Sequence, residues 1–248
     1  MIYSPALRDR HAPPAQQEDM RQLRVLIAEM GGLAEAALAR ALAALQRHDH
    51  EAARTVIDGD RAIDAMEVRA GEMVAALIAR RAPTGDDLRE VLACYRIAGL
   101  IERVGDYAKT VAKRMPQADL TGDDLGGAAE PMRLIATLGA GVRELLRQAL
   151  DAFSARDADA AVEVCARDRD VDALYNALFL ALLGRMMKAP DDVPACSQLL
   201  FIAKSLERVG DQATNIAELV HYARQGDHLP DRHAARQGRG ERQGASAG

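Results

Sequence analysis

The chain has 248 residues, of which 49% are hydrophobic and 28% charged, so it can build a packed core and disorder along its whole length is excluded. Aromatic residues make up only 3%, and Ala and Leu dominate, which favours helices over sheets. The net charge of −5 provides no general basic surface, and no apolar run reaches the ~20 residues of a membrane span. We therefore expect an all-α protein with no nucleic-acid partner.

Cysteine usage and the first residues indicate the compartment. Cys94, Cys165 and Cys196 are scattered without metal or redox spacing, which is typical of a reducing environment. Residues 1–14 lack the apolar stretch of a secretory signal. We expect a cytoplasmic protein that is peripheral to the membrane at most.

The chain begins with an arm and a first bundle. Residues 1–17 contain three prolines and little apolar material, which predicts a flexible arm. Apolar residues at helical spacing then predict three long helices within residues 18–116. These helices are expected to pack as the first three-helix bundle.

A linker and a second bundle follow. Residues 117–130 are rich in Gly and acidic residues and lie between Pro116 and Pro131, which predicts a linker. Residues 131–224 repeat the pattern of three helices, and the Gly-, Arg- and Gln-rich residues 225–248 predict a disordered tail. The predicted fold is two tandem three-helix bundles related by an internal pseudo-repeat, which gives an elongated molecule.

The two halves share acidic motifs at matching places. The third helices contain IERVGDYA at 101–108 and LERVGDQA at 206–213, and on the second helices residues 57–64 align with 165–172. Each of these helices therefore carries two carboxylates one turn apart on one face. The pairs are Asp60 with Asp64, Glu102 with Asp106, Asp168 with Asp172 and Glu207 with Asp211.

These carboxylates border apolar stripes, where ionised groups need a partner. Carboxylates facing each other between two helices suit Fe(III), Mn(II), Mg(II) or Ca(II), and we predict metal binding by all eight residues. Gly105 and Gly210, inside the motifs, leave room for a cluster or a neighbouring helix. The alternative is an acidic surface satisfied by water and arginine, with no metal.

Enzyme chemistry has little support in the sequence. The six histidines lie outside the acidic pairs, so the Glu-x-x-His scheme of ferritin-like di-iron proteins is missing. No P-loop, dinucleotide fingerprint or nucleophile elbow occurs. We predict no catalytic residues, and a carboxylate-bridged di-metal enzyme stays as the weaker alternative.

The motifs GDRAIDAME, CARDRDVDALY and the twin ERVGD sequences resemble the PhoU family over residues 21–222. That resemblance implies two three-helix bundles that bind iron or zinc clusters, or other metals such as manganese or magnesium, through the eight acidic residues. Two departures from internal symmetry indicate unequal sites: Lys113 stands where the second half has Glu218, and Glu67 where it has Tyr175.

The resemblance also implies a function. It predicts a negative regulator of phosphate uptake and phosphate-starvation signalling, with the ATPase subunit of the phosphate ABC transporter and a phosphate-sensing histidine kinase as partners, acting as a homodimer. An accessory protein of a different phosphate transporter is the alternative. Arg103 and Arg208 turn away from the acidic line, where they either contact an acidic partner or pair within the chain.

Overall fold

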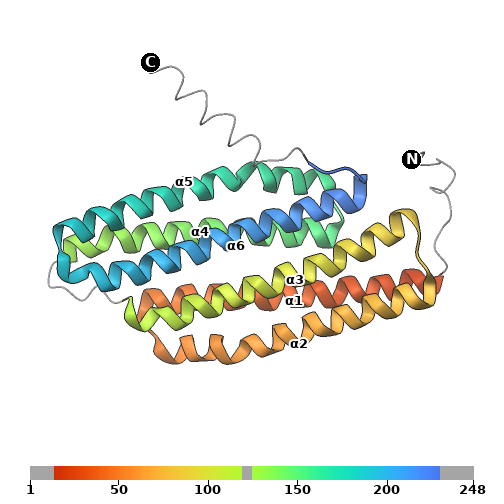
Figure 1. Ribbon diagram of the computed structural model, residues 1–248, viewed down its shortest axis with the longest axis horizontal. Helices are drawn as coiled ribbons and strands as arrows, with labels where there is room; N and C mark the ends of the chain where they lie inside the picture. The colour runs from red at the N-terminus through yellow and green to blue at the C-terminus, as the bar shows by residue number, and fades with distance from the viewer. Residues whose placement is uncertain (1–13, 119–124, 230–248) are drawn as a thin grey trace, which may run out of the picture.

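A computed structural model describes residues 14–118 and 125–229 of the chain. These residues form α1 (Pro14–Arg47), α2 (His50–Arg81), α3 (Gly85–Arg114), α4 (Leu125–Ala155), α5 (Ala158–Lys188) and α6 (Val193–Gln225), with short 3₁₀ turns η2 (Met115–Gln117) and η3 (Pro190–Asp192) (Figure 1). No β-strand occurs in these two ranges, and none of their helices is apolar enough to cross a membrane. The all-α prediction is confirmed.

The pseudo-repeat is visible in the turns before α2 and α5. Asp49 and Asp157 are the N-caps of these helices, and each carboxylate accepts two backbone N–H bonds of 2.9–3.1 Å. The residue before each cap, His48 or Arg156, has a left-handed φ of 52° or 57°. The two halves therefore enter their second helices by the same local chemistry.

α1 begins inside the segment 1–17 that the sequence predicted to be a flexible arm. α1 starts at Pro14, so residues 14–17 belong to the first bundle, whereas residues 1–13 lie outside the described part. Proline suits the first helical position, because its fixed φ is helical and its missing N–H is not needed there. Buried Gln16 also donates a 2.8 Å hydrogen bond to Asp87 at the start of α3, which anchors this turn.

The predicted linker is shorter than residues 117–130. α4 begins at Leu125 and contains Pro131 within its second turn, so residues 125–130 are helical. The Ala-Ala-Glu segment before Pro131 favours a helix, and a proline this close to the start removes a single backbone hydrogen bond. Residues 119–124, with Gly122, lie outside the described part. At the other end α6 stops at Gln225, and residues 230–248 of the predicted tail are also outside it.

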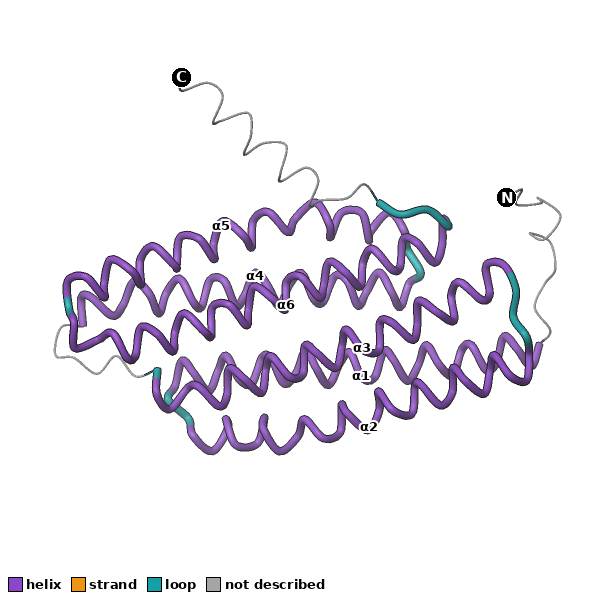
Figure 2. Tube along the Cα trace, in the orientation of Figure 1, coloured by secondary structure: helices purple, strands orange, loops and turns teal. Residues whose placement is uncertain are grey.

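The two bundles lie side by side along their length. Helices α1–α3 form one bundle and α4–α6 the other, and they meet where α1 contacts α4 and where α3 contacts α6 (Figures 1 and 2). Helices α2 and α5 lie on the outer sides of this arrangement. The molecule is therefore elongated, as the helix lengths predicted.

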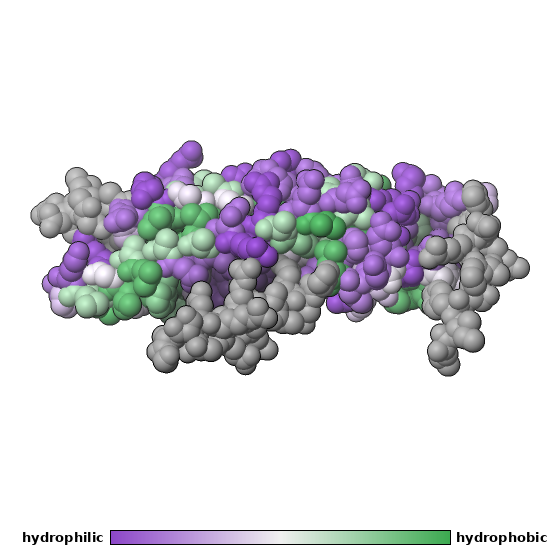
Figure 3. Space-filling view, turned by 90° about the horizontal axis from the view of Figure 1, so that it is seen from above, coloured by the Kyte–Doolittle hydropathy of each residue, from purple (hydrophilic) through white to green (hydrophobic). Residues whose placement is uncertain are grey.

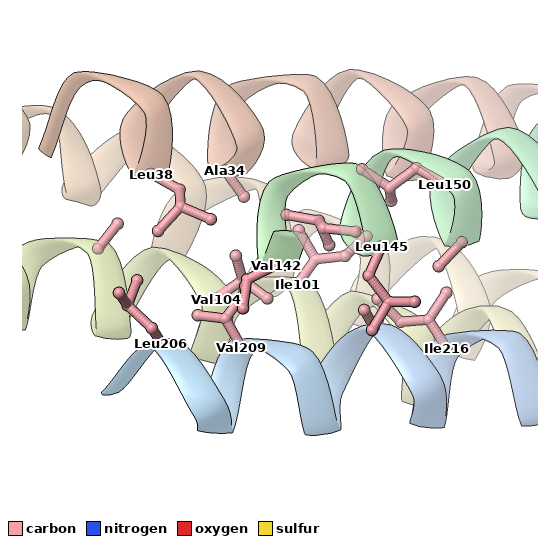
Figure 4. Packing of buried hydrophobic residues seen from close by; sticks show 14 of the residues in the cluster. Ala34, Leu38, Ile101, Val104, Val142, Leu145, Leu150, Leu206, Val209 and Ile216 are labelled. Carbon is pink, nitrogen blue, oxygen red and sulfur yellow. The ribbon is translucent and has the colours of Figure 1, made fainter. Parts of the chain in front are cut away.

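One apolar core runs through both bundles. Ile101 and Val104 of α3 meet Val142 and Leu145 of α4 and Val209 of α6 in its centre (Figure 4). The buried residues of the two halves form a single connected cluster, so the two bundles share this core.

Glycines allow the closest contact between the bundles. A Cβ atom on Gly31 of α1 would lie 2.7 Å from Cδ2 of Leu150 on α4, and one on Gly139 of α4 would lie 2.8 Å from Cδ2 of Leu42 on α1. These two contacts occupy equivalent places in the pseudo-repeat. Because a Cβ at either glycine would collide with a leucine, the glycines determine how closely α1 and α4 approach.

Candidate functional site

The eight predicted acidic residues form one group in each half. We call Asp60 and Asp64 of α2 with Glu102 and Asp106 of α3 the first acidic face. Asp168 and Asp172 of α5 with Glu207 and Asp211 of α6 form the second acidic face. The structure thus places each group between the second and third helices of its bundle.

The motif glycines bring these helices together. A Cβ on Gly105 would lie 3.3 Å from Oδ1 of Asp60 and 3.0 Å from Cδ1 of Ile63, so α2 packs closely against α3 at the motif. In the second half a Cβ on Gly210 would lie 3.2 Å from Cγ1 of Val171 on α5. Of the two roles that the sequence left open for the glycines, the structure shows approach of a neighbouring helix.

Lys109 supplies a positive charge to the first acidic face. Its ammonium forms an ion pair with Asp60, whose side chain is only 3% exposed, and lies 3.4 Å from Oδ1 of Asp106. The hydrogen bond to Asp60, followed by the charges of Asp60 and Asp106, raises the pKa of Lys109 despite its partial burial. The buried carboxylate is therefore neutralised by a residue of the chain itself.

Glu102 shows that the carboxylates of the first face interact. Burial raises its pKa, and the negative charges of Asp106, Asp64, Glu67 and Asp60 raise it further. Glu67, which lies one turn beyond the predicted pair on α2, is thus part of the same electrostatic environment. These side chains share one side of the α2–α3 pair and are not scattered over opposite faces.

Asp211 is the most perturbed carboxyl of the second face. Burial, together with the negative charges of Glu207, Asp168 and Asp172, raises its pKa to about 6, while the charge of Lys204 opposes the rise. The Nζ atom of Lys204 lies 2.7 Å from Oε2 of Glu207, and Glu207 precedes Asp211 by one turn of α6. An added positive charge would therefore stabilise the ionised form of the Asp211 carboxyl and lower its pKa.

Asp168 of the second face is partly buried and has a neutral partner. The Thr214 hydroxyl is fully buried and lies 3.1 Å from Oδ1 of Asp168 and 3.0 Å from the carbonyl oxygen of Gly210. Thr214 occupies the place in the repeat that Lys109 has in the first half. Lys109 therefore binds Asp60 through a charged ammonium in the first half, and Thr214 binds Asp168 through a neutral hydroxyl in the second.

Both faces offer only oxygen donors, which suit Fe(III), Mn(II) or Mg(II). In residues 14–118 and 125–229, however, no three acidic, His or Cys side chains converge closely enough to hold one ion. The four carboxylates of each face thus do not converge on one point within these ranges, and metal binding by them stays a prediction.

A cleft of about 600 Å³ adjoins the first acidic face between the bundles. Glu67 and Glu102 line it from the first half, and Asn215 and Glu218 line it from α6. Asn215 and Glu218 follow Asp211 at helical spacing on α6, and the packing of α3 against α6 brings them to this cleft.

The two motif arginines differ in their contacts. The guanidinium carbon of Arg208 lies 5.9 Å from the centre of the Tyr107 ring on α3, which is a cation–π contact between the halves. Arg103 is exposed at the cleft and forms no ion pair with any residue that the structure describes. The chain therefore uses Arg208 internally and leaves the Arg103 guanidinium accessible.

Sequence reasoning missed the residues that accompany the carboxylates. Lys109 follows Asp106 by three positions and Thr214 follows Asp211 by three, so helical spacing places both on the motif face. That spacing was available in the sequence. Lys204, three positions before Glu207, carries the same signal.

Known proteins of the same architecture extend over both halves. A curated relative from Zymomonas mobilis, named a phosphate-specific transport system accessory protein PhoU homolog, is 43% identical over 222 residues, which are 90% of this chain and 92% of that protein. The accessory protein PhoU of Escherichia coli is 30% identical over 215 residues, or 86% and 87% of the two chains. The crystal structure of PhoU from Pseudomonas aeruginosa superposes with a TM-score of 0.77 at 35% identity, covering 86% of this chain and 99% of that one.

The family model for the PhoU domain matches twice. Residues 27–115 correspond to the first bundle and residues 135–220 to the second, so the two matches agree with the pseudo-repeat. Both acidic faces lie within the matched ranges. The chain belongs to the PhoU family.

Proposed function

We propose that this protein is a negative regulator of phosphate uptake and of phosphate-starvation signalling. The observation that carries the proposal is the match of both bundles to the PhoU domain, together with relatives named as accessory proteins of the phosphate-specific transport system. When phosphate is plentiful, the protein acts on the ATPase subunit of the phosphate ABC transporter and restrains uptake. It also acts on the phosphate-sensing histidine kinase and keeps starvation genes off.

The proposed role is regulatory rather than catalytic. The acidic faces contain carboxylates, lysines and a threonine, but no histidine or cysteine pair that would serve as nucleophile and base. Long helices that expose charged side chains are suited to binding other proteins. The di-metal enzyme stays the weaker candidate.

A cation is proposed to bind the second acidic face. Asp168, Asp172, Glu207 and Asp211 would hold iron, zinc, manganese or magnesium, and the positive charge of the ion would stabilise the ionised form of Asp211, whose pKa is raised by burial and by its acidic neighbours. Thr214 orients Asp168 for this role. The four residues of the first face would bind more weakly, because Lys109 competes for Asp60 and Asp106.

Elemental analysis of protein purified without chelator tests this cation site. The double variant Glu207→Gln, Asp211→Asn should lose most of the bound metal, whereas Glu102→Gln, Asp106→Asn should lose less. Asp170→Asn removes an exposed acid of α5 and serves as the matched control. Equal metal content in all four proteins, or none in the wild type, would contradict the proposal.

Arg103 is proposed to contact an acidic surface of the ATPase subunit. Its guanidinium is exposed and suits bidentate binding of a carboxylate. We expect Arg103→Ala to keep the melting temperature and to weaken capture of the ATPase subunit. Arg61→Ala, an exposed arginine of α2, is the control. A drop in stability with intact capture would refute the contact.

Deletion of the gene decides between the functional alternatives. Starvation reporters that become constitutively active in phosphate-rich medium, and are repressed again by the intact gene, support the proposed regulator. Unchanged reporters with altered uptake indicate an accessory protein of a different phosphate transporter. Turnover of a phosphoester or of oxygen by the purified, metal-loaded protein would favour the enzyme.

A further inference from the structure

The cleft between the bundles lies where the described part of the chain ends. His228 lines this cleft together with Glu102 of α3 and Glu218 of α6, and Leu229 beside it is half-buried. Residues 230–248, which we call the tail segment, follow directly and lie outside the described part. The tail segment therefore begins beside a cleft of about 600 Å³.

The turn after α6 brings the chain to this position. Gly226 follows the helix with a left-handed φ of 84°, which ends it. The ring of His228 then stacks on the ring of Tyr222, with centroids 4.4 Å apart, so the chain runs back over the last turns of α6. In the same turn, Nε2 of His221 lies 3.3 Å from Oδ1 of Asp227. These contacts hold the end of the described chain against α6.

A residue of the first bundle holds the same turn from the opposite side. The guanidinium carbon of Arg89 on α3 lies 5.9 Å from the centre of the Tyr222 ring. A Cβ atom on Gly226 would lie 2.9 Å from Nη1 of Arg89, so the guanidinium lies directly beside the turn. The direction in which the chain leaves α6 is therefore set by contacts with both bundles.

Acidic side chains outnumber basic ones around the cleft. Glu67, Glu102 and Glu218 line it, against Arg96 and Arg103. The cleft also adjoins the first acidic face, whose other three carboxylates add negative charge. A segment with several arginines and an occasional acid is complementary to such a surface, because the acid can meet the cleft arginines.

The tail segment has this composition. It carries four arginines against two acidic residues, and those nearest to His228 are Asp231, Arg232 and Arg236. Four and eight extended residues span up to about 13 Å and about 26 Å, so both arginines can reach the carboxylates of the cleft that His228 lines.

The composition of the tail segment also excludes the apolar surface of the molecule as its docking site. The segment contains no large hydrophobic residue. The larger hydrophobic areas gather at the left in Figure 3, whereas α6 ends at the right in Figure 1. A contact through charges beside the end of α6 therefore fits the segment better than burial on a distant apolar surface.

We propose that residues 230–236 dock in the cleft of the same chain, where Arg232 and Arg236 pair with the carboxylates of Glu67 and Glu102. The docked segment is an autoinhibitory contact, because it closes the cleft to other ligands until it is released. Arg103 lines the same cleft, so under the proposed function the segment competes with the ATPase subunit for this arginine. The docking itself does not depend on that function.

A cysteine placed in the cleft reports whether the segment covers it. Leu100 lines the cleft and is half-buried, so Leu100→Cys in the full chain supplies a reporter thiol. Cys165→Ala removes the native cysteine that is only partly buried, whereas Cys94 and Cys196 are buried and can stay. The measurement is the rate at which an uncharged maleimide modifies the thiol at low salt, where ion pairs are screened least.

Reversing the charges nearest to the cleft should uncover this thiol. We expect Arg232→Glu, Arg236→Glu to raise the modification rate about threefold to tenfold, because two solvent-accessible ion pairs together change an equilibrium by about this factor. Arg239→Glu, Arg242→Glu makes the same change of charge further along the segment and should leave the rate unchanged. Leu92→Cys, at a 45% exposed position of α3 outside the cleft, should react equally fast with every form of the segment.

Exchange of the charges tests the pairing itself. Glu67→Lys, Glu102→Lys should also speed modification of the reporter thiol, because the segment then meets like charges. Combined with Arg232→Glu, Arg236→Glu, the same cleft variant should recover most of the protection. Helical circular dichroism verifies that each variant is folded.

Equal modification rates with the native and the charge-reversed segment would overturn the proposal, as would a failure of the exchanged charges to restore protection. Protection that grows with protein concentration would also overturn it, since the segment would then come from another copy. If inorganic phosphate protects the thiol and the segment does not, the cleft binds an anion through Arg96 and Arg103 instead.

Discussion

Replacing Lys109 by threonine gives the first acidic face the same partner that the second face has in Thr214. The change removes the ammonium that pairs with Asp60, a carboxylate whose side chain is 3% exposed. A buried charge that loses its partner is strongly destabilising, and a threonine side chain at this position is too short to replace the charge. We therefore expect Lys109→Thr to lower the stability of the protein.

The magnitude follows from the burial of the two partners. Breaking a fully buried ion pair costs about 3–5 kcal/mol, but the Lys109 side chain is 27% exposed, so the value for a charged hydrogen bond, about 2 kcal/mol, applies better. For a protein of this size, that loss lowers the melting temperature by about 4–8 °C.

The pH dependence follows from the raised pKa of Lys109. Because this pKa lies above the ordinary 10.5, the contribution of the pair is complete below pH 10.5 and disappears as the pH rises through the folded-state value. The difference in unfolding free energy between Lys109→Thr and the wild type should therefore have its full value at pH 7.

The assay is urea and thermal unfolding of metal-free protein, followed by circular dichroism. Lys113→Thr is the matched control, because Lys113 is exposed one turn further along α3 and should tolerate the change within about 0.5 kcal/mol. If Lys109→Thr and Lys113→Thr unfold alike at pH 7, Lys109 does not neutralise Asp60 in the way the structure indicates.

Three other predictions concern the second face and the contact between the bundles. Because the pKa of Asp211 is raised from 3.8 to about 6, the folded state binds the proton of this carboxyl more tightly than the unfolded state does, so the free energy of unfolding should fall as the pH rises from about 4 to about 6. Asp211→Asn should flatten this pH dependence in urea unfolding and should add about 1–2 kcal/mol to the free energy of unfolding at pH 7. Adding Mn²⁺ to metal-free wild type should raise its melting temperature in calorimetry, and an equal rise in Glu207→Gln, Asp211→Asn would contradict the assignment of the second face. Gly139→Ala should destabilise by about 1–3 kcal/mol because its Cβ would collide with Leu42, whereas Gly59→Ala, which meets open space, should stabilise by up to about 1 kcal/mol; the reverse order in thermal unfolding would refute the role of Gly139.

The helices and the repeat are determined locally, which is why the sequence predicts them. The periodic apolar residues, the capping aspartates and the prolines all act within a few positions along the chain. Helix boundaries are harder to predict from local patterns, because they also depend on contacts between distant residues. Gln16 is an example: its hydrogen bond to Asp87 joins residues far apart in the sequence and orders a turn whose composition predicted a flexible arm.

The acidic faces were predictable in part for the same reason. Spacing along α3 and α6 places Glu102 with Asp106 and Glu207 with Asp211, and the repeat implies that matching helices face each other. Spacing does not show which basic side chain reaches which acid across two helices. The pairing of Lys109 with Asp60 therefore required the packing of α2 against α3.

The sequence by itself determined the six helices, the two related bundles and the acidic residues that each bundle gathers, because these follow from local periodicity and from repetition. Only the tertiary structure decided how the bundles join. Gly31 and Gly139 receive leucines from the opposite bundle, and α3 packs against α6, so the two halves share one core. Such contacts depend on complementary shapes between distant segments, and no pattern within a single helix records which surface it will meet.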